Sequence, residues 1–409
     1  MAKLLYLVHR LPYPPDKGDK VRSYHLLKHL LAQHEVHLGS FIDDPEDERH
    51  VPALQALCAS TCLRPLQPRS AKLKSLSGLA TGEALTLRYY DDARLDAWVA
   101  ETLAREAIDA IVVFSSSMMP YAQRHAAGRP VLLDLVDVDS AKWTQYAHNH
   151  AWPLSWLYRR EGARLLAYER QAVAAATASF LVTAQEVALF ERLAPECRGR
   201  VTAVANGVDA EFFAPDASRP SPFAPDELPI VFTGAMDYWP NIDAVTWFVQ
   251  DMLPALRQRH PALRFHIVGR APTPAVRALA GPAVSVTGTV PDVRPYLQHA
   301  AAVVAPLRLA RGVQNKVLEA MAMGKAVVCA RSCVQAIGDP AQVPLCPAET
   351  AADHLEQLLR LLEQAPSAQA LGLAARRHVL AHYSWPARLA GVDVALQHAC
   401  RTNLSVEPA

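Results

Sequence analysis

Two series of short apolar runs, separated by a proline-rich stretch, constrain what this chain can fold into. The first series lies at residues 3–8, 35–41, 110–114, 130–136 and 179–183, and the second at 228–234, 263–269, 283–288, 301–307 and 325–330. Segments with the apolar spacing of helices separate the runs. Continuous apolar strands that alternate with helices indicate a parallel sheet covered on both faces. The sequence therefore predicts an α/β protein with two doubly wound halves.

The proline-rich stretch at residues 206–229 predicts the boundary between the halves. Five of its last fifteen residues are proline, which keeps the chain extended. We expect a Rossmann-like first domain over 1–205, a second over 206–384, and a C-terminal helix from Trp385 that returns to the first domain, followed by a tail to residue 409. Ligands of such folds bind at the carboxyl ends of the strands, so function is expected in a cleft that the two halves face.

Composition excludes several classes of partner. The 41 basic and 40 acidic side chains give a formal net charge of +1, so no overall field draws the chain onto nucleic acid. The seven cysteines are scattered and never spaced CxxC, which favours reduced thiols over disulfides or a zinc site. The apolar run at residues 4–8 is too short for a signal peptide or a spanning helix. We expect a cytoplasmic protein.

The most informative window is APLRLARGVQNKVLEAMAMGKAVV, residues 305–328. It predicts a strand end, a loop in which Gly312 permits close backbone approach, and a helix over residues 313–323 whose start favours phosphate. Asn315, Lys316 and Glu319 share one face of that helix. An ammonium and a carboxylate one turn apart can pair with phosphate and accept from two ribose hydroxyls. The alternative is an exposed Lys-Glu pair worth under ~1 kcal/mol.

The string RGVQNKVLEAMAMGKAVV resembles the signature of the retaining glycosyltransferases of family four, which have the two-domain GT-B fold and often read EGFGxxxLEAMAxGxPVV. The resemblance implies that Glu319 holds the nucleotide ribose and that Lys316 supplies charge to phosphate. Arg311 stands where the family carries its first glutamate, which alters the expected contacts to the donor sugar. AVANGVDAEFF at 203–213 resembles the start of the family's second domain.

Two further segments extend the resemblance. FTGAMDYWPNIDAVTWF at 232–248 resembles the first strand, loop and helix of the family's second domain, which implies that Gly234 faces the diphosphate. TGTVPDVRPYL at 287–297 resembles the segment that lines the base, with Thr289 and Val290 nearest. The family's GRxxxxKG arginine and lysine are missing here. Another cation must then neutralise the leaving group, and the candidates are Arg270, Arg308, Arg311 and Lys316.

In the first half, LPYPPDKGDKVRSYHLL at 11–27 stands where the family has a glycine-rich loop. Gly18 and the following helix start can present N–H groups to phosphate or sugar, with Lys17, Lys20 and Arg22 near, although a plain turn glycine is the alternative. The strings PYPPDKGDK and DVDSAKW resemble a branch found beside PEP-CTERM and exosortase systems in exopolysaccharide loci.

Asp137-Val138-Asp139 spells DxD, the divalent-metal signature of the other, single-domain glycosyltransferase fold. The two-half architecture argues against that use, and three-residue motifs recur by chance. We expect no metal and no cofactor, and we expect Asp137 to contact the acceptor or donor sugar. Lys316, Arg311 and Asp137 are thus the candidate catalytic residues, and Gly18, Gly234, Arg270, Thr289, Val290, Gly312, Asn315 and Glu319 the candidate donor-binding residues.

Two basic segments bear on the acceptor. Residues 63–76 carry four cations and no acidic residue, and residues 152–166 interleave Trp152, Trp156 and Tyr158 with arginines. Either segment could rest on anionic lipid headgroups, as an enzyme of lipid-linked saccharides at the inner face of the plasma membrane requires. The alternative is a solvated loop and an amphipathic core helix.

Together these features predict a retaining hexosyltransferase that moves a sugar from a nucleotide diphosphate sugar to a lipid-linked exopolysaccharide precursor. A GT-B nucleotide-sugar epimerase and a non-catalytic nucleotide-sugar-binding protein remain alternatives. A dinucleotide oxidoreductase is disfavoured because no GxGxxG follows the first apolar run.

Overall fold

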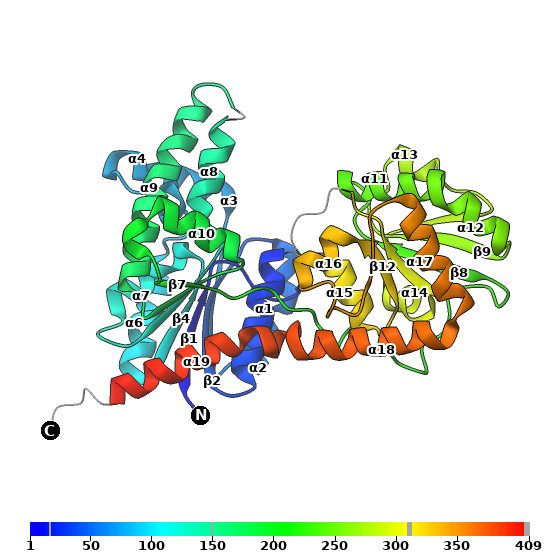
Figure 1. Ribbon diagram of the computed structural model, residues 1–409. Helices are drawn as coiled ribbons and strands as arrows, with labels where there is room; N and C mark the ends of the chain where they lie inside the picture. Colours follow the sequence, from blue (N-terminus) through cyan, green and yellow to red (C-terminus); the bar gives the residue numbers. More distant parts are fainter. Residues whose placement is uncertain (16–17, 149, 309–312, 405–409) are drawn as a thin grey trace. The chain divides into compact units, whose positions relative to one another are not determined.

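The computed structural model describes residues 1–15, 18–148, 150–308 and 313–404. The chain forms two compact units, each a parallel sheet with helices on both faces (Figure 1). The first unit comprises residues 1–206 and the C-terminal segment from Arg388, and the second comprises Gly207–Ala387. The sequence placed the two breaks after residues 205 and 384.

The first unit contains a seven-stranded sheet in the order β3-β2-β1-β4-β5-β6-β7, and all of its strand pairs are parallel. The strands are β1 (Lys3–Val8), β2 (Glu35–Ile42), β3 (Ser60–Pro65), β4 (Ala110–Phe114), β5 (Val131–Val136), β6 (Ala178–Leu181) and β7 (Val201–Ala203). The five apolar runs predicted for this half are all strands. The edge strands β3 and β7 were not predicted, because β3 is only partly buried and β7 has three residues.

The helices of the first unit connect these strands. They are α1 (Gly18–Leu31), α2 (Val51–Leu57), α3 (Pro68–Ser75), α4 (Ser77–Thr81), α5 (Leu85–Tyr89), α6 (Ala93–Arg105), α7 (Met119–His125), α8 (Asp139–His148), α9 (Leu154–Ala175) and α10 (Ala184–Leu193), with 3₁₀ turns at Pro45–His50, Ser116–Met118 and Pro195–Cys197. The last helix, α19 (Trp385–Leu404), joins the first unit from Arg388 on, where Asp393 Oδ1 lies 2.8 Å from His29 Nε2.

The second unit contains a six-stranded parallel sheet in the order β10-β9-β8-β11-β12-β13. Its strands are β8 (Leu228–Thr233), β9 (Leu263–Val268), β10 (Val284–Gly288), β11 (Ala302–Ala305), β12 (Val327–Ala330) and β13 (Cys346–Ala348). Its helices are α11 (Trp239–Trp247), α12 (Leu253–Arg259), α13 (Pro274–Arg277), α14 (Arg294–His299), α15 (Asn315–Ala322), α16 (Arg331–Ile337), α17 (Ala351–Glu363) and α18 (Ala365–His382), with a π-helical turn at Phe248–Met252. All strands of this sheet except the short β13 coincide with apolar runs that the sequence predicted.

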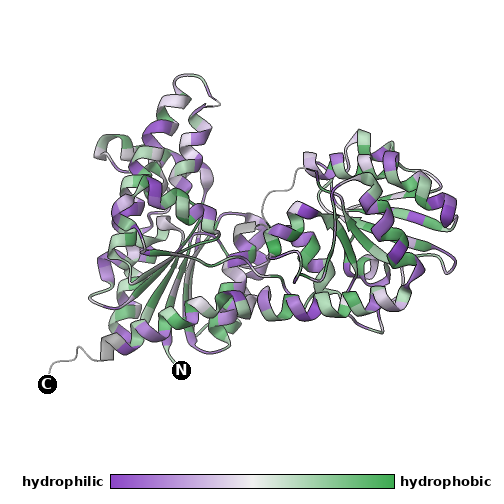
Figure 2. Ribbon diagram, viewed as in Figure 1, coloured by the Kyte–Doolittle hydropathy of each residue, from purple (hydrophilic) through white to green (hydrophobic). Residues whose placement is uncertain are grey.

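The inner strands are mostly apolar along their length because both faces of each sheet are covered. Figure 2 shows this as continuous green strands between helices banded in purple and green. In β1, for example, every residue from Leu4 to Val8 is buried. The helices bury only one side, and their starts are fixed locally: Thr350 and Asp353 form a reciprocal capping box at the start of α17.

Two cations that the sequence placed beside a phosphate have partners inside the first unit. Lys20 Nζ lies 2.6 Å from Asp47 Oδ2, and Arg22 Nε lies 2.8 Å from Asp134 Oδ2. Arg22 also donates to the carbonyl of Val204 at 2.7 Å. Both cations are almost fully buried. The expectation that these two cations are available to a phosphate near Gly18 is therefore wrong. They join α1 to other elements of its unit instead. Lys17 lies outside the described residues.

Candidate functional site

A cavity of about 590 Å³ opens in the second unit where the strand order reverses. The strand β8 lies between β9 and β11. At such a switch point the connecting helices on the two sides cover opposite faces of the sheet, and a crevice forms at the carboxyl ends of the strands. The volume lies within the ~300 to 1,000 Å³ typical of small-molecule sites. Seven predicted donor-site residues line it, namely Gly234, Arg270, Thr289, Val290, Asn315, Lys316 and Glu319.

Two glycines allow the backbone to turn at the floor of this cavity. Gly234 follows β8 with φ +156° and Gly269 follows β9 with φ +157°. A Cβ on Gly269 would stand 1.6 Å from the carbonyl oxygen of Gly234, and one on Gly234 would stand 2.9 Å from Lys316 Nζ. Neither position can carry a side chain without displacing its neighbours. The missing side chains thus let the backbone after β9 pack against Gly234 and let Lys316 and Asn241 approach the end of β8.

Lys316, in the first turn of α15, brings a cation to the same place. Its ammonium donates a hydrogen bond to the amide oxygen of Asn241 and lies 4.3 Å from the centre of the Phe232 ring. Burial disfavours the charged form and lowers the pKa of Lys316 to about 8, although Glu319 opposes this effect. A weakly solvated ammonium of this kind is stabilised strongly by an arriving anion.

Glu319 lies one turn further along α15 and faces the same cavity. Burial raises the pKa of its carboxyl group to about 7, while Lys316 acts in the lowering direction. No described residue donates a hydrogen bond to this carboxylate. Two acceptor oxygens in a half-buried position, with no protein donor among the described residues, suit a pair of ligand hydroxyls.

The start of α15 itself also lies in the cavity, because Gln314, Asn315 and Lys316 line it. The first backbone N–H groups of a helix have no partner within the helix and favour an anion. Val317, Leu318 and Met321 are buried on the opposite side, as the predicted apolar stripe requires. The helix starts at Asn315, two residues later than predicted, since Gln314 is extended, and Val313 is exposed rather than part of the stripe.

Of the four candidate cations for the diphosphate, Lys316 and Arg270 line the cavity. The exposed guanidinium of Arg270 has no partner among the described residues. Arg308 does not line the cavity. It forms two hydrogen bonds with Asp243, one of 3.0 Å, and lies over the ring of Trp247. Arg311 and Gly312 lie outside the described residues.

Two predicted site residues belong to the first unit and are not among the residues that line this cavity. Gly18 begins α1. The carboxylate of Asp137 lies 2.9 Å from Lys142 Nζ, which also lies 2.9 Å from Asp139 Oδ1. The two carboxylates of the DxD string thus share an ammonium. A role for Asp137 at the sugar stays a prediction.

Only one group of described residues, Glu35, His37 and Glu106, has ligand atoms close enough together for a metal ion. Lys3 Nζ already contacts both glutamates, at 3.3 Å and 2.9 Å. An ammonium therefore occupies the place that a cation would take.

Nine residues that line the cavity were not predicted as site residues, and Thr233, Tyr238, Asn241 and Gly269 are four of them. Gly269 had a usable signal, since it follows an apolar run just as Gly234 does. The hydroxyl oxygen of Thr233 is buried with no hydrogen-bond partner in the described structure, a pattern that marks a place for a ligand atom. Asn241 gave no signal, because its contact with Lys316 depends on how the loop after β8 turns.

Residues 227–364 match the protein family described as Glycosyl transferases group 1, a stretch that contains the whole cavity. Among curated protein sequences, none matches the chain.

Solved structures share the fold over nearly the whole chain. Sucrose-phosphate synthase from Thermosynechococcus elongatus is 18% identical, with a TM-score of 0.60 over 98% of this chain and 100% of that one. HepE from Anabaena in complex with UDP is 15% identical, with a TM-score of 0.61 over 97% and 100%. WaaG, a glycosyltransferase involved in lipopolysaccharide biosynthesis, is 16% identical, with a TM-score of 0.55 over 96% and 99%. The chain therefore has the predicted GT-B fold, and the matched domain supports its place in the GT-B glycosyltransferase superfamily.

Proposed function

We propose that this protein is a retaining glycosyltransferase of family four that takes a hexose from a nucleoside diphosphate sugar. The observation that carries the proposal is the meeting of Lys316, Glu319 and the start of α15 in a cavity at the switch point of the second sheet. The cation and the helix start suit a diphosphate, and the carboxylate suits the hydroxyls of a ribose. The structure of HepE with UDP supports a nucleotide donor.

In the proposed complex, the carboxylate of Glu319 accepts from the ribose hydroxyls and the base rests near Thr289 and Val290. The diphosphate lies between Gly234 and the start of α15, where Asn315 presents its backbone N–H group, and Gly312 is proposed as a further donor-binding residue. Arg270, whose guanidinium has no partner among the described residues, reaches the phosphates from the end of β9. Gly18, at the start of α1, is proposed to present a backbone N–H group to phosphate or to the transferred sugar.

The chemical task is to stabilise charge as the bond between the sugar and phosphate breaks. Negative charge then grows on the diphosphate, and each preorganised donor such as Lys316 typically lowers the barrier by on the order of 3 kcal/mol. Arg311 and Asp137 complete the proposed catalytic set, Arg311 at the phosphate and Asp137 at a sugar. Side-chain cations supply the charge, so the proposal includes no metal and no cofactor.

Glu319 is the one carboxylate among the described residues that line the cavity, and its assignment to the ribose leaves no described side chain there to act as a nucleophile. The acceptor hydroxyl therefore attacks the face that the leaving group vacates, which retains the anomeric configuration. The departing phosphate oxygen takes the proton of the acceptor hydroxyl.

We further propose that the acceptor is a lipid-linked precursor of an exopolysaccharide of the PEP-CTERM-associated kind, at the inner face of the plasma membrane in the cytoplasm. The support is the resemblance of PYPPDKGDK and DVDSAKW and the two basic segments in the first unit. None of the helices within the described residues is both long and apolar enough to cross a membrane. Contact with the bilayer would therefore be peripheral along the described part of the chain.

A thermal-shift panel of UDP-, GDP- and ADP-sugars tests the donor, because a ligand that binds the folded state raises its stability by mass action. We expect one nucleotide series to raise the melting temperature. The stabilising donor is then incubated with lipid-linked acceptors, and the product is analysed by mass spectrometry and its anomeric configuration by NMR. Free epimerised sugar nucleotide would instead indicate an epimerase, and binding without any turnover a non-catalytic sensor.

A further inference from the structure

Large apolar side chains are exposed together at one end of the first unit. Leu73 lies on α3, Leu76 follows that helix and Leu79 lies on α4, while Trp152 precedes α9 and Leu154 and Trp156 lie in its first turn. The side chain of Trp152 is 80% exposed and that of Leu73 73%. We call these six residues the tip surface. An exposed apolar group of this size marks an interaction site rather than a packing accident.

The two parts of the tip surface lie side by side because polar contacts at the start of α9 fasten them together. Arg160 donates to the carbonyl of Gly78 at 2.6 Å and to that of Glu83 at 3.2 Å. The buried carboxylate of Glu161 accepts from the backbone N–H groups of Leu85 and Thr86 at 2.7 Å and 2.8 Å, at the start of α5. The helices α3 and α4 accordingly flank the α8–α9 pair (Figure 1).

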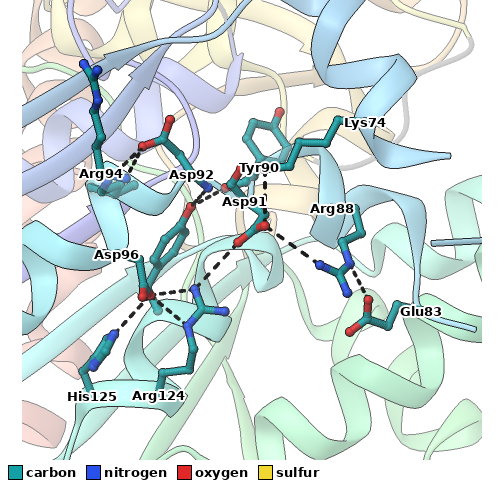
Figure 3. Close-up of polar contacts among 12 residues, drawn as sticks. Lys74, Glu83, Arg88, Tyr90, Asp91, Asp92, Arg94, Asp96, Arg124 and His125 are labelled. Atoms are coloured by element: carbon teal, nitrogen blue, oxygen red, sulfur yellow. Dashed lines mark hydrogen bonds and ion pairs between the residues drawn. The ribbon is translucent and has the colours of Figure 1, made fainter. Parts of the chain in front are cut away.

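A second set of contacts fixes α3. Lys74 donates to the backbone carbonyl of Asp91, and its ammonium lies 3.3 Å from the Asp91 carboxylate. Figure 3 shows Lys74 and Arg88 meeting at Asp91, which Arg124 approaches from α7. Leu73 is therefore exposed on an anchored helix.

The hairpin of α8 and α9 has its own packed interior, so its tip tryptophans are not exposed for lack of structure. Tyr158 contacts Trp143 and His150, with ring centres 5.3 Å and 5.1 Å apart. A Cβ on Gly162 would stand 2.4 Å from the Thr144 hydroxyl, which shows how closely the two helices approach. The aromatic residues of this segment thus divide into an inner set that packs and an outer pair, Trp152 and Trp156, that does not.

Exposed cations lie on α3 and α9, the helices that carry Leu73 and Trp156, while the nearby acids Glu83 and Asp91 are paired with Arg88 and Lys74. Arg69, Lys72 and Arg159 are exposed, and none of the three has a hydrogen-bond or ion-pair partner in the part of the chain that the structure describes. Residues 63–76 contain no acidic side chain. Indole and leucine side chains with a fringe of unpaired cations match the boundary between lipid headgroups and acyl chains.

We propose that the tip surface docks the first unit on an anionic lipid bilayer, with Trp152 and Trp156 at the headgroup boundary and Arg69, Lys72 and Arg159 on lipid phosphates. This inference rests on the proposed function for its purpose, which is to bring the enzyme to a lipid-linked acceptor. A second copy of the chain is a poorer occupant, because two tip surfaces face to face would set cations against cations.

Flotation of the whole protein with vesicles tests the surface at low salt. We expect binding to vesicles of phosphatidylglycerol and phosphatidylcholine, and weak binding to phosphatidylcholine alone. Trp152→Ser combined with Trp156→Ser should lower the partition coefficient about tenfold or more. Arg69→Ser combined with Lys72→Ser should remove most of the preference for the anionic lipid. The matched control is Val394→Ser, a 67% exposed apolar residue of α19 in the same unit, which should bind as the unchanged protein does.

Several results would overturn the inference. One is the failure of the unchanged protein to float with anionic vesicles. Another is a loss of vesicle binding in Val394→Ser as large as that in the double Trp variant. A third is a double Trp variant that binds vesicles normally but changes from a dimer to a monomer in light scattering. If the double Trp variant does not fold, quenching of the tryptophan fluorescence of the unchanged protein by brominated lipids serves as the test. We expect quenching, and an absence of quenching would contradict the inference. Turnover of a detergent-solubilised acceptor is measured separately. Turnover without flotation refutes only the surface, and flotation without donor binding refutes only the proposed function.

Discussion

Lys316 donates a hydrogen bond to the side-chain oxygen of Asn241, which stands 75 residues earlier in the chain. Asn241 in turn donates to the carbonyl of Ala235 at 2.8 Å. These two contacts join the start of α15 to the loop after β8, so that the ammonium lies at the end of the central strand. No carboxylate of the described residues lies within ion-pairing distance of it. The charge is held in place by a neutral partner and left available to a ligand.

Lys316→Ala should therefore lower turnover more than it lowers donor binding. In the proposed mechanism the ammonium meets the additional charge that develops as the diphosphate leaves, and removal of one such donor typically costs about 100- to 1,000-fold in kcat. Steady-state kinetics with donor in excess, beside donor affinity by calorimetry, separates the two effects. Arg308→Ala is the matched control, because Arg308 is paired with Asp243 outside the cavity and should leave both quantities within about twofold. Equal losses in the two variants would count against the role of Lys316.

Gly269→Ala should damage the donor site through the backbone. The added methyl group would collide with the carbonyl of Gly234, and the φ of +157° is unfavourable for alanine. We expect a loss of roughly 3 kcal/mol or more in the free energy of unfolding, or a displaced β8 loop with donor affinity below detection. Urea unfolding and calorimetry measure the two. Gly281→Ala is the control, since no atom lies within 4 Å of its added Cβ. A Gly269→Ala protein with normal stability and normal affinity would refute this description of the cavity floor.

Donor affinity should pass through a maximum near neutral pH. In the free protein the pKa of Lys316 is about 8, so above that value the anionic donor must bind with uptake of a proton. The pKa of Glu319 is about 7, so below that value its carboxyl group must release a proton before it can accept from two hydroxyls. Affinity should fall on both sides of this range, on the alkaline side by no more than the loss that Lys316→Ala causes. Calorimetry in buffers of different ionisation enthalpy reports the protons directly, and a flat profile without proton exchange would be inconsistent with both assignments.

Glu319→Gln should stabilise the ligand-free protein above neutral pH. The folded-state pKa of about 7 lies above the ordinary 4.5. Ionisation of Glu319 therefore lowers the free energy of unfolding progressively as the pH rises from 4.5 to 7, and by its full amount above that. The whole shift corresponds to about 3 kcal/mol, and partial exposure of the side chain reduces the expected gain to roughly 1 to 2 kcal/mol. Urea unfolding at alkaline and at acidic pH checks the sign. A variant that gains as much at pH values below 4.5 would contradict the burial argument.

The sequence predicted most of the fold because long apolar strands are buried on both faces. It missed β3, in which Thr61 and Arg64 interrupt the pattern at a sheet edge, and the three-residue strands β7 and β13, which are too short for any periodic signal. Within the second unit, the resemblance supplied the functional residues of α15. The supporting residues Asn241 and Thr233 could not be predicted, since their role comes from the turn after β8 and from burial of one hydroxyl group.

In the first unit, spacing alone misassigned Lys20 and Arg22. A cation that follows a glycine loop looks available to phosphate in sequence, but here each one finds a carboxylate that is distant in the chain, Asp47 and Asp134. Residue type and position near a loop do not reveal such partners, because a buried ion pair depends on which elements the sheet brings together.

The most direct test is isothermal titration calorimetry of the unchanged protein and Glu319→Ala with the nucleotide sugar that the thermal-shift panel selects. The proposed function assigns Glu319 to the ribose, so the variant should lose at least about tenfold in donor affinity, which is 1.4 kcal/mol, while its melting temperature without ligand stays close to that of the unchanged protein. Equal affinity in the two folded proteins would contradict the claim that the start of α15 binds a nucleotide.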